Sequence, residues 1–207
     1  MDPKEAYLIG FLHATRVPGH PTVRHRDSVV MEEAAKFLNR VCEHRKIPHV
    51  RLHHPEQPLH GMEKEARLTL PPEIVEEINR PLSEIFEVFR PEQRHLERGI
   101  LEGCGTLCYK KSTHGMGISF TSHDRDGLET LRNEVQKHHP CLPILKTERG
   151  SHWFSIEDRA TKSYAEWLYG NPTDPHSPSR KRKLQQVLGA LRSPGILLND
   201  PPGPVGE

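Results

Sequence analysis

Two short stretches, each at the end of an expected helix, decide the fold. The first is LIGFLHATR, residues 8–16, and the second is RGILEGCG, residues 98–105. In each stretch two small residues lie four positions apart, Gly10 with Ala14 and Gly99 with Gly103. Small residues at this spacing share one helix face and let two helix backbones approach closely. A glycine near a helix end is also the usual C-cap, so the argument depends on the pattern occurring twice.

The surroundings of the two stretches repeat as well. Hydrophobic periodicity in the second half predicts a helix, two strands, a helix, two strands and a helix, over residues 91–105, 106–112, 116–123, 124–139, 142–147, 151–156 and 160–169. The first half predicts helices over 4–15, 31–44 and 72–79, and strands over 22–26, 49–54 and 65–70. The strand over 22–26 is the weakest of these, and one hairpin of the first half is poorly formed. The shared order indicates an internal duplication with a period near ninety residues, from Gly10 to Gly99.

The predicted fold class is therefore α/β, with two copies of an αββαββα unit. We expect the first copy over residues 1–80, a linker over 81–91 and the second copy over 92–171. The tail, residues 172–207, contains seven of the nineteen prolines and reads as linker or disorder. Within it, Ser179 is expected to cap a short amphipathic helix over 180–192 that begins with four basic residues. Three interpretations of this basic helix start are open: a solvated surface, a phosphate contact or a segment that docks a partner.

Composition excludes some classes of protein. The 207 residues carry 29 Lys and Arg against 28 Asp and Glu, so net charge gives no sign of nucleic-acid binding. No apolar stretch approaches the roughly 20 residues of a membrane span, and the N-terminus lacks a signal-peptide pattern. We therefore expect an intracellular protein with no membrane partner. Four cysteines in a chain of this length do not indicate a disulfide framework. Buried thiols are favoured over a zinc site formed by Cys104, Cys108 and His138, His139 or Cys141.

The duplicated pattern resembles the LAGLIDADG homing-endonuclease family in its single-chain, two-repeat form. The matching phrases are RGILEGCG, ISFTS at 118–122 and AEWLYGN at 165–171. The resemblance covers roughly residues 4–171 and leaves the tail outside. It implies a pseudo-twofold saddle in which the two motif helices pair at the centre and the sheets line a DNA groove. It also implies a monomer, because a duplicated chain satisfies its own interface.

The sequence departs from the family at the catalytic positions. In the family, each motif helix ends in an acidic residue, and the two acids bind divalent metal and cut both strands. The matching residues here are Thr15 and Cys104, which lack the carboxylate oxygens that magnesium prefers. Glu102 lies two residues before Cys104 and so projects from a roughly opposite side of the helix. We expect no catalytic residues and no cofactor, with Mg²⁺ relevant only if the nuclease is active.

Strand alternation gives candidate nucleic-acid contacts, because apolar residues face the helices and their neighbours face outward. The expected outward residues are Arg24, Arg26, Arg51, His53, Arg67 and Thr69 in the first half, and Thr106, Cys108, Lys110, Ser119, Thr121 and His123, with Arg149 in a turn, in the second half. Such a mixture suits phosphate and base-edge contacts, although an ordinary solvated sheet face has the same composition. Lys146 is ranked lower, because it shares the parity of Leu142 and Ile144.

These observations predict a double-stranded DNA-binding protein of this fold with lost or reduced nuclease activity, either a regulator or a decayed mobile-element protein. One alternative is an active site-specific endonuclease with divergent metal ligands. Another is a protein-binding or RNA-binding module on the same fold, with a protein partner docking through the tail. The sequence alone leaves these alternatives open.

Overall fold

The computed structural model describes residues 2–16, 20–54, 65–110, 115–139, 144–171, 173, 176–177 and 182. Apart from residue 182, the predicted tail helix and the rest of the tail after residue 177 lie outside this part of the chain. Seven α-helices and two antiparallel sheets form the described structure, which confirms the α/β class. No described helix is both long enough and apolar enough to cross a membrane.

The first half contains three helices and three strands among the described residues. They are α1 (Pro3–Thr15), β1 (Thr22–His25), α2 (Ser28–Arg45), β2 (Arg51–His53), β3 (Ala66–Thr69) and α3 (Pro72–Ile78). The strands form a sheet in the order β1-β3-β2. A single bridge between Arg16 and Val23 stands where the second half has a complete hairpin. The weak hairpin expected in this half is thus reduced to one bridge in the described residues.

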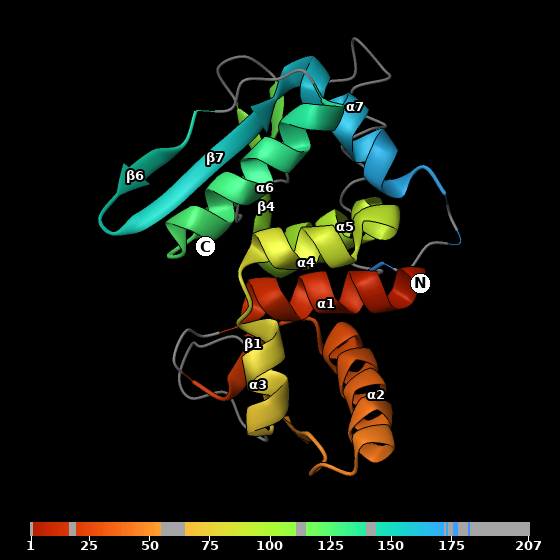
Figure 1. The fold of residues 1–207 in the computed structure, drawn as a ribbon. Helices are drawn as coiled ribbons and strands as arrows, with labels where there is room; N and C mark the ends of the chain where they lie inside the picture. Colours follow the sequence, from red (N-terminus) through yellow and green to blue (C-terminus); the bar gives the residue numbers. More distant parts are fainter. Residues whose placement is uncertain are drawn as a thin grey trace, which may run out of the picture.

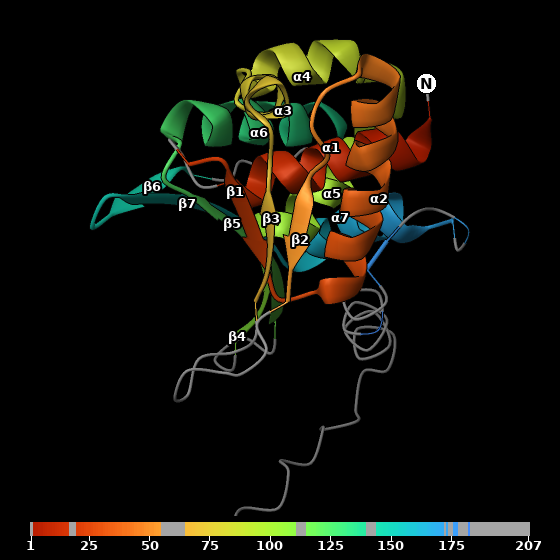
Figure 2. The ribbon, with the colours of Figure 1, turned by 90° about the horizontal axis from the view of Figure 1, so that it is seen from below.

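The second half follows the predicted order in full. Its elements are α5 (Gln93–Cys104), β4 (Gly105–Lys110), β5 (Gly115–Ser122), α6 (Arg125–His138), β6 (Lys146–Glu148), β7 (Ser151–Glu157) and α7 (Asp158–Tyr169). The strands pair antiparallel in the order β4-β5-β7-β6. In Figure 2 helices α3 and α4 lie at the top of the view, and the strands of both sheets extend below them.

The segment expected as a plain linker is helical. Residues 82–88 form α4 (Leu82–Val88), and a short 3-10 helix, η1 (Arg90–Glu92), leads into α5. The apolar side chains Leu82, Ile85 and Phe86 are buried in the core of the second half, and α4 lies close to α6. The i, i+3, i+4 spacing of these residues is that of an amphipathic helix, so the linker adds a layer to the second core.

Helices α1 and α5 lie side by side at the centre of the molecule with their backbones in contact (Figure 1). A Cβ atom built on Gly10 would lie 2.2 Å from the carbonyl oxygen of Leu96, and one on Gly99 would lie 2.0 Å from that of Tyr7. On Gly103 it would lie 2.8 Å from the Cβ of Ala14. No side chain fits at such distances, so the small residues are what allow this approach. Helix α1 is consequently buried on nearly all sides.

Candidate nucleic-acid interface

The face of the first sheet that is turned away from its core carries basic side chains in two rows. Strand register places Arg24, Arg67 and His53 side by side across β1, β3 and β2, and Thr22, Thr69 and Arg51 in the next row. The three arginines and His53 are exposed, whereas Val23 and Leu68 on the opposite face are fully buried. We call these six residues the first outer face. All of them but Thr22 are among the predicted contacts.

The corresponding face of the second sheet is rich in hydroxyl groups. Register aligns Thr106, Ser119 and Ser155 in one row and Thr121, Trp153 and Lys146 in another. The ammonium of Lys146 lies 4.8 Å from the centre of the Trp153 ring, a cation–π contact. We call these six residues the second outer face. The side chains of two predicted members, Cys108 and Lys110, lie outside the described residues.

Strand alternation in the sequence ranked Lys146 low and did not predict Trp153 or Ser155. The expected strand began at Leu142, whereas β6 begins at Lys146 and Ile144 is exposed. Leu142 and Ile144 lie before the strand and so do not indicate which way Lys146 points. Trp153 could have been found from β7 itself, since it alternates with the buried Phe154 and Ile156.

The remaining predicted contacts lie at strand ends. Arg26 is exposed and forms a 3.8 Å ion pair with Glu65, which partly balances its charge. Nδ1 of His123 lies 3.2 Å from the carbonyl oxygen of Gly150, in the turn that joins β6 to β7. Arg149 in the same turn is exposed and has a left-handed φ of 49°. His123 and Arg149 thus share one end of the second sheet.

The two catalytic positions of the motif hold a hydroxyl and a thiol in place of carboxylates. The hydroxyl of Thr15 is buried and donates to the carbonyl oxygen of Phe11 at 2.7 Å. Cys104 is a partly buried thiol at the end of α5 and forms no disulfide within the described residues. Neither group supplies the anionic oxygens that a hard cation such as magnesium requires. Within the described part of the chain, no group of three His, Cys, Asp or Glu residues is arranged to hold a metal ion.

Glu102 is occupied by structural hydrogen bonds. It is fully buried, and its carboxylate accepts from the hydroxyls of Tyr7 at 2.6 Å and Tyr169 at 2.8 Å and from the backbone N–H of Ser177 at 2.6 Å. Burial raises the pKa of Glu102, whereas these hydrogen bonds and the nearby Arg98 act to lower it. The carboxylate therefore joins α1, α5, α7 and the tail, and its oxygens point into the protein.

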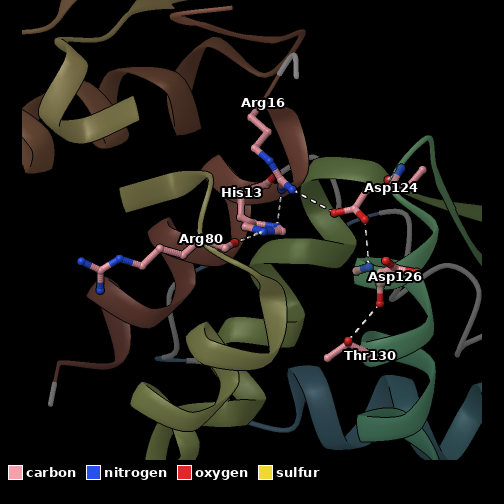
Figure 3. A network of polar contacts seen from close by, with 8 residues as sticks. His13, Arg16, Arg80, Asp124, Asp126 and Thr130 are labelled. Atoms are coloured by element: carbon pink, nitrogen blue, oxygen red, sulfur yellow. Dashed lines mark hydrogen bonds and ion pairs between the residues drawn. The ribbon is translucent and has the colours of Figure 1, made fainter. Parts of the chain in front are cut away.

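His13 occupies the position in α1 that Glu102 occupies in α5, and it belongs to a second polar network (Figure 3). The guanidinium of Arg16 donates to Nδ1 of His13 at 2.6 Å and to Asp124 at 3.0 Å. Nε2 of His13 therefore carries the proton and donates to the carbonyl oxygen of Arg80 at 3.3 Å. Burial, followed by the charge of Arg16, lowers the pKa of His13 to about 3. His13 is thus a neutral structural group.

A cavity of about 170 Å³ lies beside this network. Apolar side chains from α4, α5 and α6 line one part, and polar groups line the other, among them Cys104, Thr121, His123 and Asp124. The end of the first motif helix, the edge of the second outer face and the start of α6 therefore meet at one place.

Solved structures share this fold. The homing endonuclease I-DmoI in complex with DNA and calcium superposes with a TM-score of 0.59 at 12% identity, covering 89% of this chain and 97% of that one. The N-terminal LAGLIDADG domain of DUF199/WhiA gives 0.57 at 13% identity, with 81% and 84% covered. The homing endonuclease I-LtrWI bound to target DNA gives 0.52 at 8% identity, with 92% of each chain covered. No curated protein sequence matches the chain.

A sequence model of the LAGLIDADG class, described as a putative archaeal homing endonuclease, matches residues 65–193. The match extends past α7 into the tail, so the expectation that the tail falls outside the resemblance was wrong. It begins at residue 65, directly before β3. The matched residues form more than half of the chain and include the second motif helix with both hairpins that follow it. The chain belongs to the LAGLIDADG family of putative archaeal homing endonucleases.

Proposed function

We propose that this protein binds double-stranded DNA across its two outer faces and has lost most or all nuclease activity. The observation that carries the proposal is the first outer face, where Arg24, Arg51 and Arg67 stand exposed in adjacent rows of one sheet. Arginines in this arrangement suit phosphate contacts, and the interleaved hydroxyl and imidazole groups suit base edges. Relatives of the same fold, I-DmoI and I-LtrWI, were solved in complex with DNA.

The second outer face supports a division of tasks. Ser119, Thr121 and the predicted His123 offer hydrogen-bonding groups with little charge, and Lys146 with Trp153 adds one cation and one aromatic ring. Hydroxyl groups contact phosphate oxygens or base edges without a large electrostatic contribution. We therefore assign most of the salt-dependent affinity to the first sheet.

The residues at the C-terminal ends of α1 and α5 support the loss of nuclease activity. Thr15 donates its hydroxyl to its own helix, Cys104 is a thiol, and the nearby Glu102 is committed to three internal donors. A two-metal mechanism needs carboxylates that reach both phosphates. These residues do not fit a magnesium ion, so no hydrolytic step is assigned to them.

The test is fluorescence anisotropy with labelled 30-base-pair duplexes of random sequence over a salt series. We expect salt-sensitive binding, and Arg51→Ala with Arg67→Ala should weaken it. Each lost phosphate contact should reduce the slope of log K against log salt by about 0.9. The matched control is Arg40→Ala with Arg90→Ala, which removes the same charge from exposed positions in α2 and η1. This control pair should change the slope much less than the sheet pair does.

The same samples with magnesium, run on a denaturing gel, test the loss of cleavage. Intact strands are expected. Strands cut by the wild type but not by Glu102→Gln would support an active endonuclease and contradict our assignment of Glu102. Equal effects of the sheet pair and the control pair would contradict the assignment of the interface.

A further inference from the structure

We propose that the described residues after α7, Asn171, Thr173, His176 and Ser177, form a clasp that fixes the two halves of the molecule to each other. The proposal is based on the burial of Ser177, which is 1% exposed and makes hydrogen bonds to both halves. Its backbone N–H donates to Glu102 in α5, and its hydroxyl donates to Asp27, 150 positions earlier in the chain. A residue of the proline-rich tail is thus built into the interior.

The internal duplication predicted from the sequence accounts for the first contact. Glu102 follows His13 by the same 89 positions that separate Gly99 from Gly10. In the first half, the segment after α3 returns to the motif helix, where the carbonyl oxygen of Arg80 accepts from His13. In the second half, the segment after α7 returns to Glu102 in the same way. The clasp is therefore the second-half counterpart of the linker.

The second contact, from Ser177 to Asp27, supplies a donor that the second motif helix lacks. Asp27 and Asp124 are the equivalent N-caps of α2 and α6. One oxygen of Asp27 accepts from the backbone N–H of Val30 at 3.3 Å, and one oxygen of Asp124 accepts from that of Gly127 at 2.9 Å. The other oxygen of Asp124 accepts from Arg16. The residue equivalent to Arg16 in the second half is Gly105, which has no donor side chain. The hydroxyl of Ser177 takes that role at Asp27.

The clasp also lies over the junction of α1 and α2. Thr173 and His176 line one side of a cavity of about 560 Å³ whose other walls include Tyr7, Leu8 and Val30. The segment therefore covers the start of the first half while it is bonded to the motif helix of the second. Its release should loosen the first turn of α2 and the hydrogen bonds of Glu102 together.

The consequence for DNA rests on the proposed function. Asp27 follows β1, the strand that carries Arg24 on the first outer face. Because the clasp joins this region to α5, it sets the position of the first outer face relative to the second. We expect an intact clasp to be needed for full DNA affinity.

The test is hydrogen–deuterium exchange of the full chain carrying Ser177→Ala, with Thr173→Ala as the matched control. Thr173 lies in the same segment, but it is exposed and its hydroxyl donates to the side chain of its neighbour Asn171. Loss of a hydrogen bond to the partly buried carboxylate of Asp27 should speed exchange in the first turn of α2 about tenfold. Thr173→Ala should leave it unchanged. Equal exchange in the two variants would overturn the clasp.

A second variant, Asp27→Ser, tests the same contact if Ser177→Ala alone has a small effect on the exchange rate. Asp27→Ser retains an N-cap but has no second oxygen for Ser177, so its effect should not add to that of Ser177→Ala. Additive effects would overturn the contact. Anisotropy with the 30-base-pair duplexes then separates the two proposals, because exchange needs no DNA. Faster exchange with unchanged affinity would overturn only the link to DNA, and wild type without DNA binding would overturn only the proposed function.

Discussion

The guanidinium of Arg16 and the carboxylate of Asp124 lie 3.0 Å apart and join the end of α1 to the start of α6. The side chain of Arg16 is 14% exposed and that of Asp124 is 37% exposed, so the pair is only partly screened by solvent. Since Asp124 also caps α6, one residue contributes to a helix terminus and to the contact between the two halves.

The two contributions of Asp124 can be separated by substitution. Asp124→Asn keeps a capping oxygen and removes the charge, and we expect it to lower the free energy of unfolding by about 1 kcal/mol. Asp124→Ala also removes the cap and should cost about 1 kcal/mol more. Urea denaturation at pH 7 measures both, with Asp2→Asn, at the exposed cap of α1, as a control expected to change little. Equal losses for the two Asp124 variants would mean that the cap contributes nothing.

The contact between α1 and α5 predicts an unusual response to alanine. Alanine favours a helix over glycine by roughly 1 kcal/mol, but a Cβ on Gly10 would lie 2.2 Å from the backbone oxygen of Leu96. The helices must therefore separate, and overpacking of this kind costs roughly 1–3 kcal/mol or more. We expect Gly10→Ala and Gly99→Ala each to lower the unfolding midpoint in urea. A stabilised variant would show that the backbones are not in contact.

Glu97 predicts a pH dependence of stability. It is fully buried, accepts from Tyr164 at 2.8 Å and Gln93 at 2.9 Å, and burial raises its pKa to about 7. The folded state thus binds this proton more tightly than the unfolded state, whose pKa is 4.5. Its stability contribution is complete below pH 4.5 and is lost as the pH rises towards 7.

Glu97→Gln removes this titration and provides the measurement. The difference in unfolding free energy between variant and wild type should shift in favour of the variant by about 3 kcal/mol between pH 4.5 and pH 8. Urea denaturation at several pH values gives this difference, and other titrating groups cancel in it. A difference that stays constant with pH would show that the carboxyl titrates normally.

Lys146 and Trp153 predict two separable effects on DNA binding. If Lys146 contacts a phosphate, Lys146→Ala should reduce the salt slope by about 0.9, whereas Trp153→Ala should weaken binding with no change in slope. Anisotropy over the salt series measures both, and Lys162→Ala in α7 removes the same charge as a control. A reduced slope for Lys162→Ala as well would point to net charge instead of a local contact.

Much of the fold followed from local patterns. The spacing of Gly10 with Ala14 and of Gly99 with Gly103 predicted two motif helices that approach closely. Alternation along β1, β2 and β3 predicted that Arg24, Arg51 and Arg67 are exposed. Such signals are contained within one turn or one strand, so neighbouring residues suffice to read them. The α4 helix carried the same kind of signal in Leu82, Ile85 and Phe86, but its position between two repeats favoured the reading as a linker.

Other features depend on partners far away in the chain. Nothing near Ser177 indicates that it is buried, because its partners Asp27 and Glu102 lie 150 and 75 positions away. Lys146 was misassigned because β6 starts four residues later than expected, and a strand's parity is fixed only by its register with a neighbour. Long-range pairing and strand ends are thus the properties that a single sequence leaves open.

In their described parts the two sheets carry different side chains, so the two sides of the molecule are chemically distinct. Three strands with exposed arginines flank one side of the central helix pair, and four strands with hydroxyl groups flank the other. A duplex lying across both would meet a different chemical surface at each of its ends. Its preferred sequence should therefore read differently on the two strands, and a palindrome built from either half-site should bind less well than the natural, non-repeating arrangement.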